Sequence, residues 1–315
     1  MKEGIVVKST GKWYSVLCTD GQEVRSRIIG KFRLGDLKLT NPVAVGDRVH
    51  IELDQEGIGS IKTIEPRKNY VVRQSPRKKH HLHLLASNLD QAIIITTIKQ
   101  PDIKFAFIDR FLLMTEPFNI PAVIVINKVD LYEEEDLWVM EGVKEMYERI
   151  GYKVIITSSE SGYGIDELRQ AMEGKISLLG GQSGVGKSSL VNAIDPDLDL
   201  RTGIISDYSG KGQHTTTFAE MFPLGDDTFI IDTPGIKTLS FNYLEPMDVA
   251  HNFKEFFAYS ENCKFGADCK HRNEPKCAVK EAVEREEISP IRYENYLTLL
   301  QEIEDQNYWE RHSDI

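Results

Sequence analysis

A glycine-rich segment in the second half of this 315-residue chain has the spacing of a phosphate-binding loop. Residues 181–188 read Gly-Gln-Ser-Gly-Val-Gly-Lys-Ser, the pattern G-x-x-x-x-G-K-[ST], after an apolar run at 176–179 and before a helical segment at 187–193. In such a strand–loop–helix unit, backbone N–H groups surround phosphate oxygens and the helix N-terminus favours negative charge. We expect Lys187 to reach the β- and γ-phosphates and the Ser188 hydroxyl to bind Mg²⁺. The residues assigned to the nucleotide here are Gly181, Gln182, Ser183, Gly184, Val185, Gly186, Lys187, Ser188 and Ser189.

A second motif, Asn127-Lys128-Val129-Asp130, follows the apolar run 122–126. It resembles the N-K-x-D motif of GTPases, in which the aspartate carboxylate accepts two hydrogen bonds from guanine. Adenine lacks that pair of donors, and a buried carboxylate left unpaired is costly, so the motif selects guanine. Ser158 follows the apolar run 154–157, in a loose match to the Ser-Ala-type loop that covers the base.

Asp232 and Gly235 frame a third motif, Asp-Thr-Pro-Gly, after the apolar run 228–231. In P-loop proteins such an Asp contacts the Mg²⁺ shell, and the Gly N–H senses the γ-phosphate. GTPases ordinarily run from the P-loop through D-x-x-G to N-K-x-D, whereas here N-K-x-D comes first and D-x-x-G last. This order predicts a circularly permuted domain, because permutation moves the termini and keeps the sheet and its site.

Four potential metal ligands lie within 15 residues near the C-terminus: Cys263, Cys269, His271 and Cys277. Three thiolates and one imidazole form a closed tetrahedral set that is typical of structural zinc, with no position open for catalysis. Reduced cysteines without metal and an iron–sulfur cluster are the alternatives, and the latter usually takes four thiolates. Because three of only four cysteines crowd together, a metal site in a reducing compartment is favoured over a disulfide scaffold.

The elements that must position these motifs change character along the chain. Residues 1–66 contain five short strand-like segments separated by turn signals, which predict a small β-barrel of the OB or SH3-like kind. From about residue 91, apolar strands alternate with helical segments, which is typical of a parallel sheet flanked by helices. After about residue 240 only helical segments follow, the last one opened by Ser289 and Pro290. The expected domains are a barrel at 1–68, a basic linker at 69–90, a GTPase domain at 91–240 and a zinc-binding domain at 241–315.

Charge is distributed unevenly along the chain. The net charge of −11 would disfavour nucleic acid, yet residues 1–90 carry a balance of +6 and the remainder −17. Residues 67–83 include six Lys/Arg and no acid, which predicts a basic surface for a polyanion; a solvated linker is the alternative. No apolar run approaches the roughly 20 residues of a membrane helix, and no secretory segment opens the chain. We expect a cytoplasmic monomer that makes no use of a membrane.

The motif order, the preceding barrel and the following Cys/His cluster together closely resemble the RsgA (YjeQ/YloQ) family of circularly permuted bacterial GTPases. The resemblance covers nearly the whole chain. It implies an N-terminal OB-fold β-barrel, a central α/β P-loop GTPase domain and a C-terminal, mainly helical zinc-binding domain. It also implies one structural Zn²⁺, Mg²⁺ with GTP or GDP, and binding to the 30S ribosomal subunit and its 16S rRNA in late assembly, with hydrolysis stimulated by the particle.

The residue that handles the attacking water is not given by the three nucleotide motifs. Many GTPases place a Gln directly after D-x-x-G, where this chain has the apolar Ile236. In the resembling family the proposed catalytic residue is a His in the loop that corresponds to 210–217, which makes His214 our candidate. Imidazole can orient water or accept its proton near neutral pH. Thr216 is our choice as the ligand of Mg²⁺ and the γ-phosphate, and Lys187 completes the catalytic set.

Two functions remain open from the sequence. One is a GTP hydrolase that acts in assembly of the small ribosomal subunit and leaves the particle on hydrolysis. The other is a nucleotide-gated rRNA-binding module with incidental hydrolysis, which Ile236 supports. In both, the barrel would contact rRNA, with Trp13 and Tyr14 as stacking platforms. A metal-insertion protein is disfavoured, because the cysteines form a closed structural set.

Overall fold

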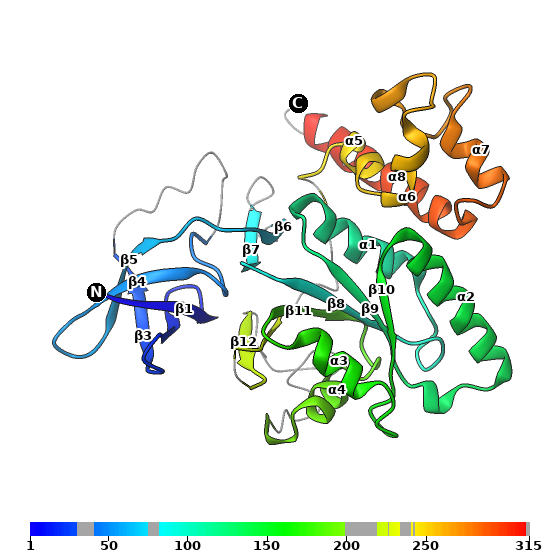
Figure 1. The fold of residues 1–315 in the computed structure, drawn as a ribbon. Coiled ribbons are helices and arrows are strands. Elements are labelled where there is room, and N and C mark those ends of the chain that lie inside the picture. The colour runs from blue at the N-terminus through cyan, green and yellow to red at the C-terminus, as the bar shows by residue number, and fades with distance from the viewer. Residues whose placement is uncertain are drawn as a thin grey trace.

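The computed structural model describes residues 1–29, 41–74, 82–198, 219–225, 227–233, 241 and 243–312, and it opens with a closed β-barrel (Figure 1). The barrel strands are β1 (Lys2–Ser9), β2 (Tyr14–Cys18), β3 (Glu23–Ile28), β4 (Arg48–Leu53) and β5 (Gly59–Ile64). Their order is β1-β2-β3-β5-β4, with β4 pairing back to β1 and β3 parallel to β5. This closed order is OB-like, so the expected fold of the N-terminal part is confirmed. Alternate residues of β2, among them Tyr14 and Val16, fill the barrel core.

A β-hairpin lies where the sequence suggested a basic linker. Strand β6 (Tyr70–Gln74) pairs antiparallel with β7 (Leu82–Ser87). Val72 and Leu84 are buried in a small core of their own, which explains why this segment is ordered as strands despite its basic composition. The basic side chains at 77–81 lie outside the described residues.

In the described part of the chain, six strands form the central sheet. They are β10 (Lys153–Ile156), β9 (Ala122–Ile126), β8 (Gln91–Thr96), β11 (Ile176–Gly181), β13 (Phe229–Asp232) and β12 (Glu220–Pro223), in this spatial order. The first five run parallel, and β12 is antiparallel to β13. The chain order reverses its direction across the sheet between β8 and β11. Ligands of parallel α/β sheets bind at such a switch point, outside the carboxyl ends of the strands.

Helices cover both faces of this sheet, as its unbroken apolar strands predict. On β8, Ala92 and Ile94 belong to one core and Ile93 and Ile95 to the other, because successive side chains point to opposite faces. The first core contains α1 (Phe105–Thr115) and α2 (Glu134–Ile150), and the second contains α3 (Ile165–Met172) and α4 (Lys187–Ile194). Short 3₁₀ turns lie at η1 (Glu116–Phe118), η2 (Val129–Leu131), η3 (Pro196–Leu198) and η4 (Gly266–Asp268).

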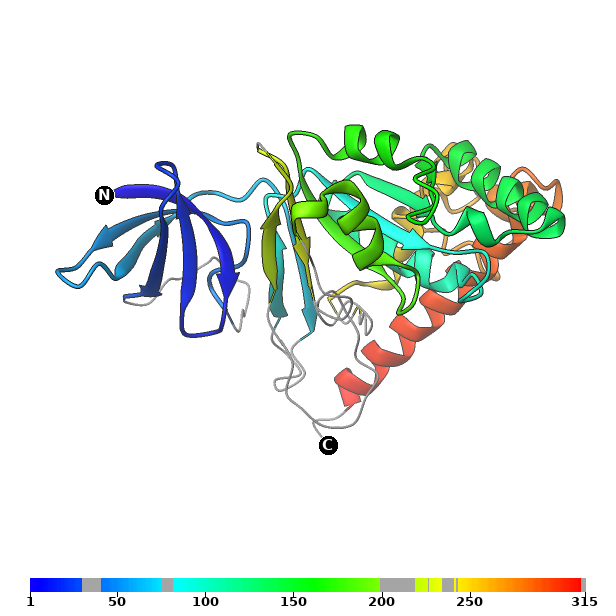
Figure 2. The ribbon, with the colours of Figure 1, turned by 90° about the horizontal axis from the view of Figure 1, so that it is seen from below.

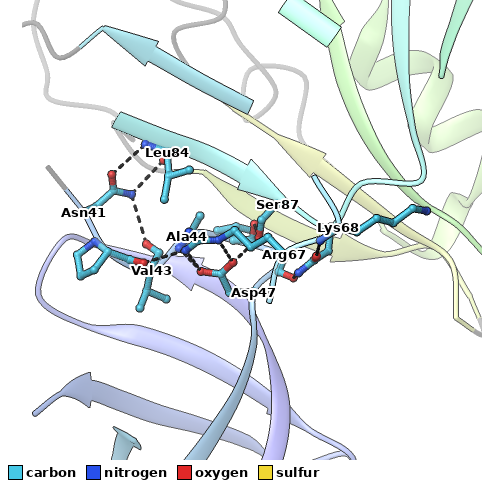
Figure 3. Close-up of polar contacts among 12 residues, drawn as sticks. Asn41, Val43, Ala44, Asp47, Arg67, Lys68, Leu84 and Ser87 are labelled. Atoms are coloured by element: carbon cyan, nitrogen blue, oxygen red, sulfur yellow. Dashed lines mark hydrogen bonds and ion pairs between the residues drawn. The ribbon is translucent and has the colours of Figure 1, made fainter. Parts of the chain in front are cut away.

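The barrel is fastened to the β6–β7 hairpin through a buried carboxylate (Figure 3). Asp47, which is fully buried, accepts hydrogen bonds from Arg67 Nε at 2.7 Å and from Arg67 Nη2 at 2.7 Å. Ser87 Oγ on β7 donates to the same carboxylate at 2.6 Å, and the Ala44 N–H donates at 2.8 Å. Arg67 neutralises the buried Asp47, whereas Lys68 forms a surface ion pair with Asp90 at 3.2 Å, so both of these cations of the basic segment have a partner within the chain.

The C-terminal part is helical and packs on α1, away from the barrel (Figures 1 and 2). Its helices are α5 (Pro246–His251), α6 (Lys254–Ser260), α7 (Ala278–Glu284) and α8 (Pro290–His312). The start of α8 at Pro290 agrees with the sequence, whereas α5 and α6 are too short to give a periodic signal. Arg292 of α8 is buried between Glu255 of α6 and Asp109 of α1, and Tyr147 of α2 donates to Asp109 at 2.8 Å. This network joins the C-terminal helices to the central domain.

Candidate nucleotide-binding and metal sites

The phosphate-binding loop stands at the carboxyl end of β11, at the switch point of the sheet. Gly184 and Gly186 have φ values of 82° and 90°, the left-handed region that glycine adopts without strain. Helix α4 begins at Lys187, and no side chain caps its first turn, so its N-terminal N–H groups face the loop as phosphate binding requires. Lys187 Nζ donates to the carbonyl oxygens of Gly181 at 3.0 Å and Gln182 at 2.8 Å. The side chain therefore lies folded over the loop that we assign to phosphate.

Asn127 joins the candidate base site to the phosphate loop. It follows β9, and its fully buried amide donates from Nδ2 to the carbonyl oxygen of Val185 at 2.9 Å. Its Oδ1 accepts a hydrogen bond from Thr157 Oγ1 at 3.1 Å. A Cβ at Gly186 would lie 2.5 Å from Asn127 Nδ2, so only glycine permits this approach. The two motifs, which lie 58 positions apart between Asn127 and Val185, thus form one unit.

Asp130 and Ser158 come together as the sequence expected. Asp130 is exposed at the mouth of the site, and Ser158 Oγ donates a hydrogen bond to its Oδ1. Ser158 Oγ in turn accepts the N–H of Ser161 at 3.0 Å, which fixes the hydroxyl that orients the carboxylate. Lys128 has a φ of 68°, and its Nζ donates to the carbonyl oxygen of Gln100 at 2.7 Å. Val129 N–H donates to the carbonyl oxygen of Thr157 at 3.2 Å.

Tyr132 is a site residue that sequence reasoning missed. Its phenol oxygen accepts the N–H of Ile98 at 2.7 Å and donates to the carbonyl oxygen of Asn127 at 2.6 Å. Burial raises the pKa of Tyr132 to about 12, so the hydroxyl keeps its proton for the second of these bonds. The phenol ties the ends of β8 and β9 together beneath the base site. No motif spacing marks it, because the contact depends on which strands are neighbours.

The D-x-x-G motif is only partly described. Asp232 ends β13 as a buried residue in register with Leu179 of β11, so its carboxylate stands near the start of the phosphate loop. Thr233 follows it and is also buried. Gly235, Ile236, His214 and Thr216 lie outside the described residues.

The four candidate metal ligands converge as the spacing predicted. The ligand atoms of Cys263, Cys269, His271 and Cys277 all lie within 4.8 Å of one another, and all four residues are buried. His271 Nδ1 lies 3.4 Å from Cys277 Sγ and 3.6 Å from Cys263 Sγ, and the two sulfurs are 3.9 Å apart. Tetrahedral zinc with Zn–S of about 2.3 Å and Zn–N of about 2.0 Å places sulfur atoms about 3.8 Å apart and nitrogen about 3.5 Å from sulfur. The residues therefore fit a metal ion of this kind.

The pKa values of the thiols and a hydrogen bond to α8 also support the assignment of this cluster to a metal ion. Burial raises the pKa of the Cys269 thiol to about 12 and also raises that of Cys277, so a cation is needed to hold these groups as thiolates. The carbonyl oxygen of His271 accepts a hydrogen bond from Tyr293 of α8 at 2.6 Å. A metal ion here would hold the segment 263–277 against α8.

Known proteins resemble this chain along nearly its whole length. The RsgA GTPase family model matches residues 64–242, and the RsgA N-terminal domain model matches residues 3–61. A Bacteroides fragilis protein named small ribosomal subunit biogenesis GTPase RsgA is 47% identical over 306 residues, which cover 97% of this chain and 98% of that protein. A Flavobacterium johnsoniae protein of the same name is 46% identical over 301 residues, 95% of this chain and 92% of its own.

Two solved structures share the fold. The crystal structure of YjeQ from Thermotoga maritima has a TM-score of 0.78 and 39% sequence identity, over 96% of this chain and 98% of that one. The structure of YloQ, described as a circularly permuted GTPase, has a TM-score of 0.73 and 31% identity, over 97% of this chain and 96% of that one. Since a family model covers more than half of the chain and the motifs stand in permuted order around one site, the chain belongs to the RsgA family of circularly permuted GTPases, which are enzymes that hydrolyse GTP.

Proposed function

We propose that this GTPase acts in assembly of the small ribosomal subunit and that the site described above is its GTP site. The observation that carries the assignment of the site is the Asn127–Val185 hydrogen bond, which holds a guanine-selective motif against a phosphate-binding loop. One bound nucleotide then satisfies both motifs. The division of the chain at residues 68, 90 and 240 is part of this proposal.

Guanine selection rests on Asp130. An ionised carboxylate can only accept hydrogen bonds, and guanine offers two donors side by side, a ring N–H and an exocyclic amine. Ser158 holds one carboxylate oxygen in place before the base arrives, which lowers the ordering cost of binding. The Lys128 stem lies against the phosphate loop, since its Cε is 3.8 Å from a Cβ built at Gly186.

The phosphates and Mg²⁺ are assigned to the loop after β11. The N–H groups of 181–189 surround the phosphate oxygens, and Lys187 exchanges its two carbonyl acceptors for the β- and γ-phosphates. Ser188, Thr216 and Asp232 are the residues that would hold Mg²⁺. The ion would supply positive charge to stabilise the charge that develops on the phosphates during hydrolysis.

Hydrolysis needs a group that positions water, and we assign this task to His214. Ile236 has no polar atom for it. A histidine on a segment that closes over the γ-phosphate would orient the water only in the complete complex, so turnover would depend on the partner that promotes closure.

The partner we propose is the 30S subunit with its 16S rRNA, because relatives at 47% identity carry the name small ribosomal subunit biogenesis GTPase. Trp13 stacks with the Arg25 guanidinium at 3.9 Å beside a groove of about 520 Å³ on the barrel, a combination suited to single-stranded RNA. Tyr14 is buried in the barrel core and is therefore not a stacking platform. The Cys/His cluster is assigned to one structural Zn²⁺.

Among the described residues, no helix combines the length and the apolarity needed to cross a bilayer. We propose that the protein works as a monomer in the cytoplasm, where the ribosomal particle and a reduced Cys/His cluster are found together.

The test is GTP turnover with purified 30S subunits, 50S subunits or neither, together with nucleotide-dependent co-sedimentation. We expect 30S subunits alone to raise the turnover rate, and pelleting with 30S to be stronger with a non-hydrolysable GTP analogue than with GDP. Slow turnover that no particle changes, with binding retained, would favour a nucleotide-gated RNA-binding module instead. Stimulation by 50S subunits rather than 30S would contradict the proposed partner.

A further inference from the structure

A small polar cavity lies where the barrel, the β6–β7 hairpin and the D-x-x-G strand meet. Its volume is about 20 Å³, and its walls come from Ser9 and Ala44 of the barrel, Arg73 and His83 of the hairpin, and Thr233. It lies next to the buried junction of Figure 3, with which it shares Asn41, Ala44 and Leu84. Thr233 directly follows Asp232, so the cavity touches the nucleotide-sensing motif from the side opposite the phosphate loop.

Two buried polar atoms in the cavity wall have no hydrogen-bond partner: Arg73 Nε and Thr233 Oγ1. Only one other such atom, Tyr243 Oη, occurs in the described part of the chain. A buried donor without a partner costs about 1–3 kcal/mol, so a folded protein seldom keeps one unless an unseen molecule satisfies it. Both unpartnered atoms line the same cavity, which indicates that a single molecule forms hydrogen bonds with both.

Asn41, another polar residue of the wall, is already held by three hydrogen bonds. Asn41 Nδ2 donates to the carbonyl oxygens of Leu84 at 3.0 Å and Val43 at 3.3 Å, and its Oδ1 accepts the Leu84 N–H at 2.9 Å (Figure 3). Rotation of the Asn41 side chain toward either unpartnered atom would break these bonds.

The local charge indicates what kind of molecule fits. Among the described residues no carboxylate lines the cavity, while the Arg73 guanidinium does. Burial, with a smaller contribution from Arg73, lowers the pKa of His83 to about 4, so the imidazole is neutral at physiological pH. The described wall of the cavity is therefore positively charged and favours a hydrogen-bond acceptor over a cation. A volume of about 20 Å³ admits a single water-sized species, since one water needs at least about 10–15 Å³.

We propose that this cavity holds one small hydrogen-bond acceptor, a water molecule or a chloride ion, that bridges Arg73 Nε and Thr233 Oγ1. The bridge joins the D-x-x-G strand to the hairpin beside the barrel. A second link runs in parallel, because Lys8 of β1 pairs with Glu220 of β12 at 2.7 Å, and Glu220 is in register with Asp232. Any displacement of Thr233 that accompanies nucleotide exchange would have to break the bridge or move the hairpin with it. The bridge would in this way couple the nucleotide state to the hairpin that adjoins the barrel.

The bridge can be tested by whether removal of the Thr233 hydroxyl lowers or raises the melting temperature. Thr233→Val has nearly the same shape and removes the hydroxyl. If the bridging molecule is present, the full-length Thr233→Val protein melts lower than wild type by about 2–4 °C, and Thr233→Ser, which keeps the hydroxyl, recovers part of the loss. If no molecule forms a hydrogen bond with the Thr233 hydroxyl, Thr233→Val should melt at the same temperature as wild type or higher, which would overturn the proposal. Thr115→Val, which removes a hydroxyl bonded to the Leu112 carbonyl at 2.9 Å, calibrates the loss of one satisfied threonine.

A double-mutant cycle tests that the partner is shared. Arg73→Met and Thr233→Val should each lower the melting temperature, and the double variant should fall no further than the larger single effect. Additive effects would refute a shared molecule, and Arg73→Met with Thr115→Val serves as the pair expected to be additive.

Two further measurements distinguish a water molecule from a chloride ion. One compares the melting temperature in chloride and in gluconate at equal ionic strength, and the other uses anomalous scattering from bromide-soaked crystals. A chloride-specific gain and a bromide peak between the two atoms identify the ion; a water peak with no anion dependence identifies water; an empty cavity overturns the proposal.

Discussion

Replacing Asn127 by Ala should weaken nucleotide binding without changing the preferred base. The amide makes two buried hydrogen bonds, to the Val185 carbonyl and from the Thr157 hydroxyl. At about 1 kcal/mol net each, their loss amounts to about 2 kcal/mol. When both loops must be in register for one nucleotide, this cost falls on binding, and about 2 kcal/mol corresponds to about a 30-fold higher Kd.

The assay is titration of a fluorescent GDP analogue and its displacement by GDP and by IDP, which lacks the exocyclic amine. Asn127→Ala should raise both Kd values by the same factor, since Asn127 holds the phosphate loop and Asp130 reads the base. Thr157→Val removes only one of the two bonds and should cost about fivefold, from about 1 kcal/mol. Asn273→Ala, on an exposed loop of the C-terminal part, is the matched control and should leave both constants unchanged. A change below threefold in Asn127→Ala, or a loss confined to GDP, would refute the reasoning.

Other predictions address the remaining parts of the molecule. Asp130→Asn should shift preference from GTP toward xanthosine triphosphate, because the amide pairs with a carbonyl where guanine has an amine; unchanged GTP affinity would exclude this motif as the base site. His214→Ala should lower 30S-stimulated turnover by roughly 10²–10⁴, as measured by phosphate release, and leave nucleotide affinity intact. Cys269→Ser or chelation should make residues beyond about 240 sensitive to protease while GTP binding persists, and one equivalent of zinc should be found in the intact protein. His83 has a folded pKa of about 4, below its ordinary value of about 6.5, so the unfolded chain binds the proton first. Stability present above about pH 6.5 should therefore fall as pH drops toward 4, and thermal melts of His83→Gln should show a shallower fall.

The sequence predicted the site where local patterns decide it. Each nucleotide motif follows an apolar strand, and parallel strands bring their carboxyl ends to one edge, so Asn127 contacts the phosphate loop at Val185, and Asp232 lies in register with Leu179 just before that loop. The Cys/His cluster is equally local, with all ligands within 15 residues, and it too converges. In both cases the spacing of the residues along the chain is enough to predict how they are arranged.

What the sequence did not predict depends on neighbours that are distant along the chain. The hairpin of β6 and β7 was expected as a basic linker, because its charge masked strands held by contacts with Phe118 and Tyr243. The hydrogen bonds of Asp47 with Arg67 and with Ser87 of β7 join residues 20 and 40 positions apart. Tyr132 acquires its role only because β8 and β9 are adjacent. Propensity and motif spacing contain none of this information.

Circular permutation gives the D-x-x-G strand a special position. In the sheet, β13 lies between β11, which carries the phosphate loop, and β12, which pairs with β1 of the barrel. Along the chain, the same strand is followed by the segment that leads to the helices around the Cys/His cluster. The barrel is therefore linked to the nucleotide-sensing strand sideways through the sheet, and the C-terminal helices are linked to it lengthwise through the chain. A particle that holds the barrel and the C-terminal helices at once would constrain this strand from two directions, which explains physically how a large partner could change the rate of a reaction that it does not touch.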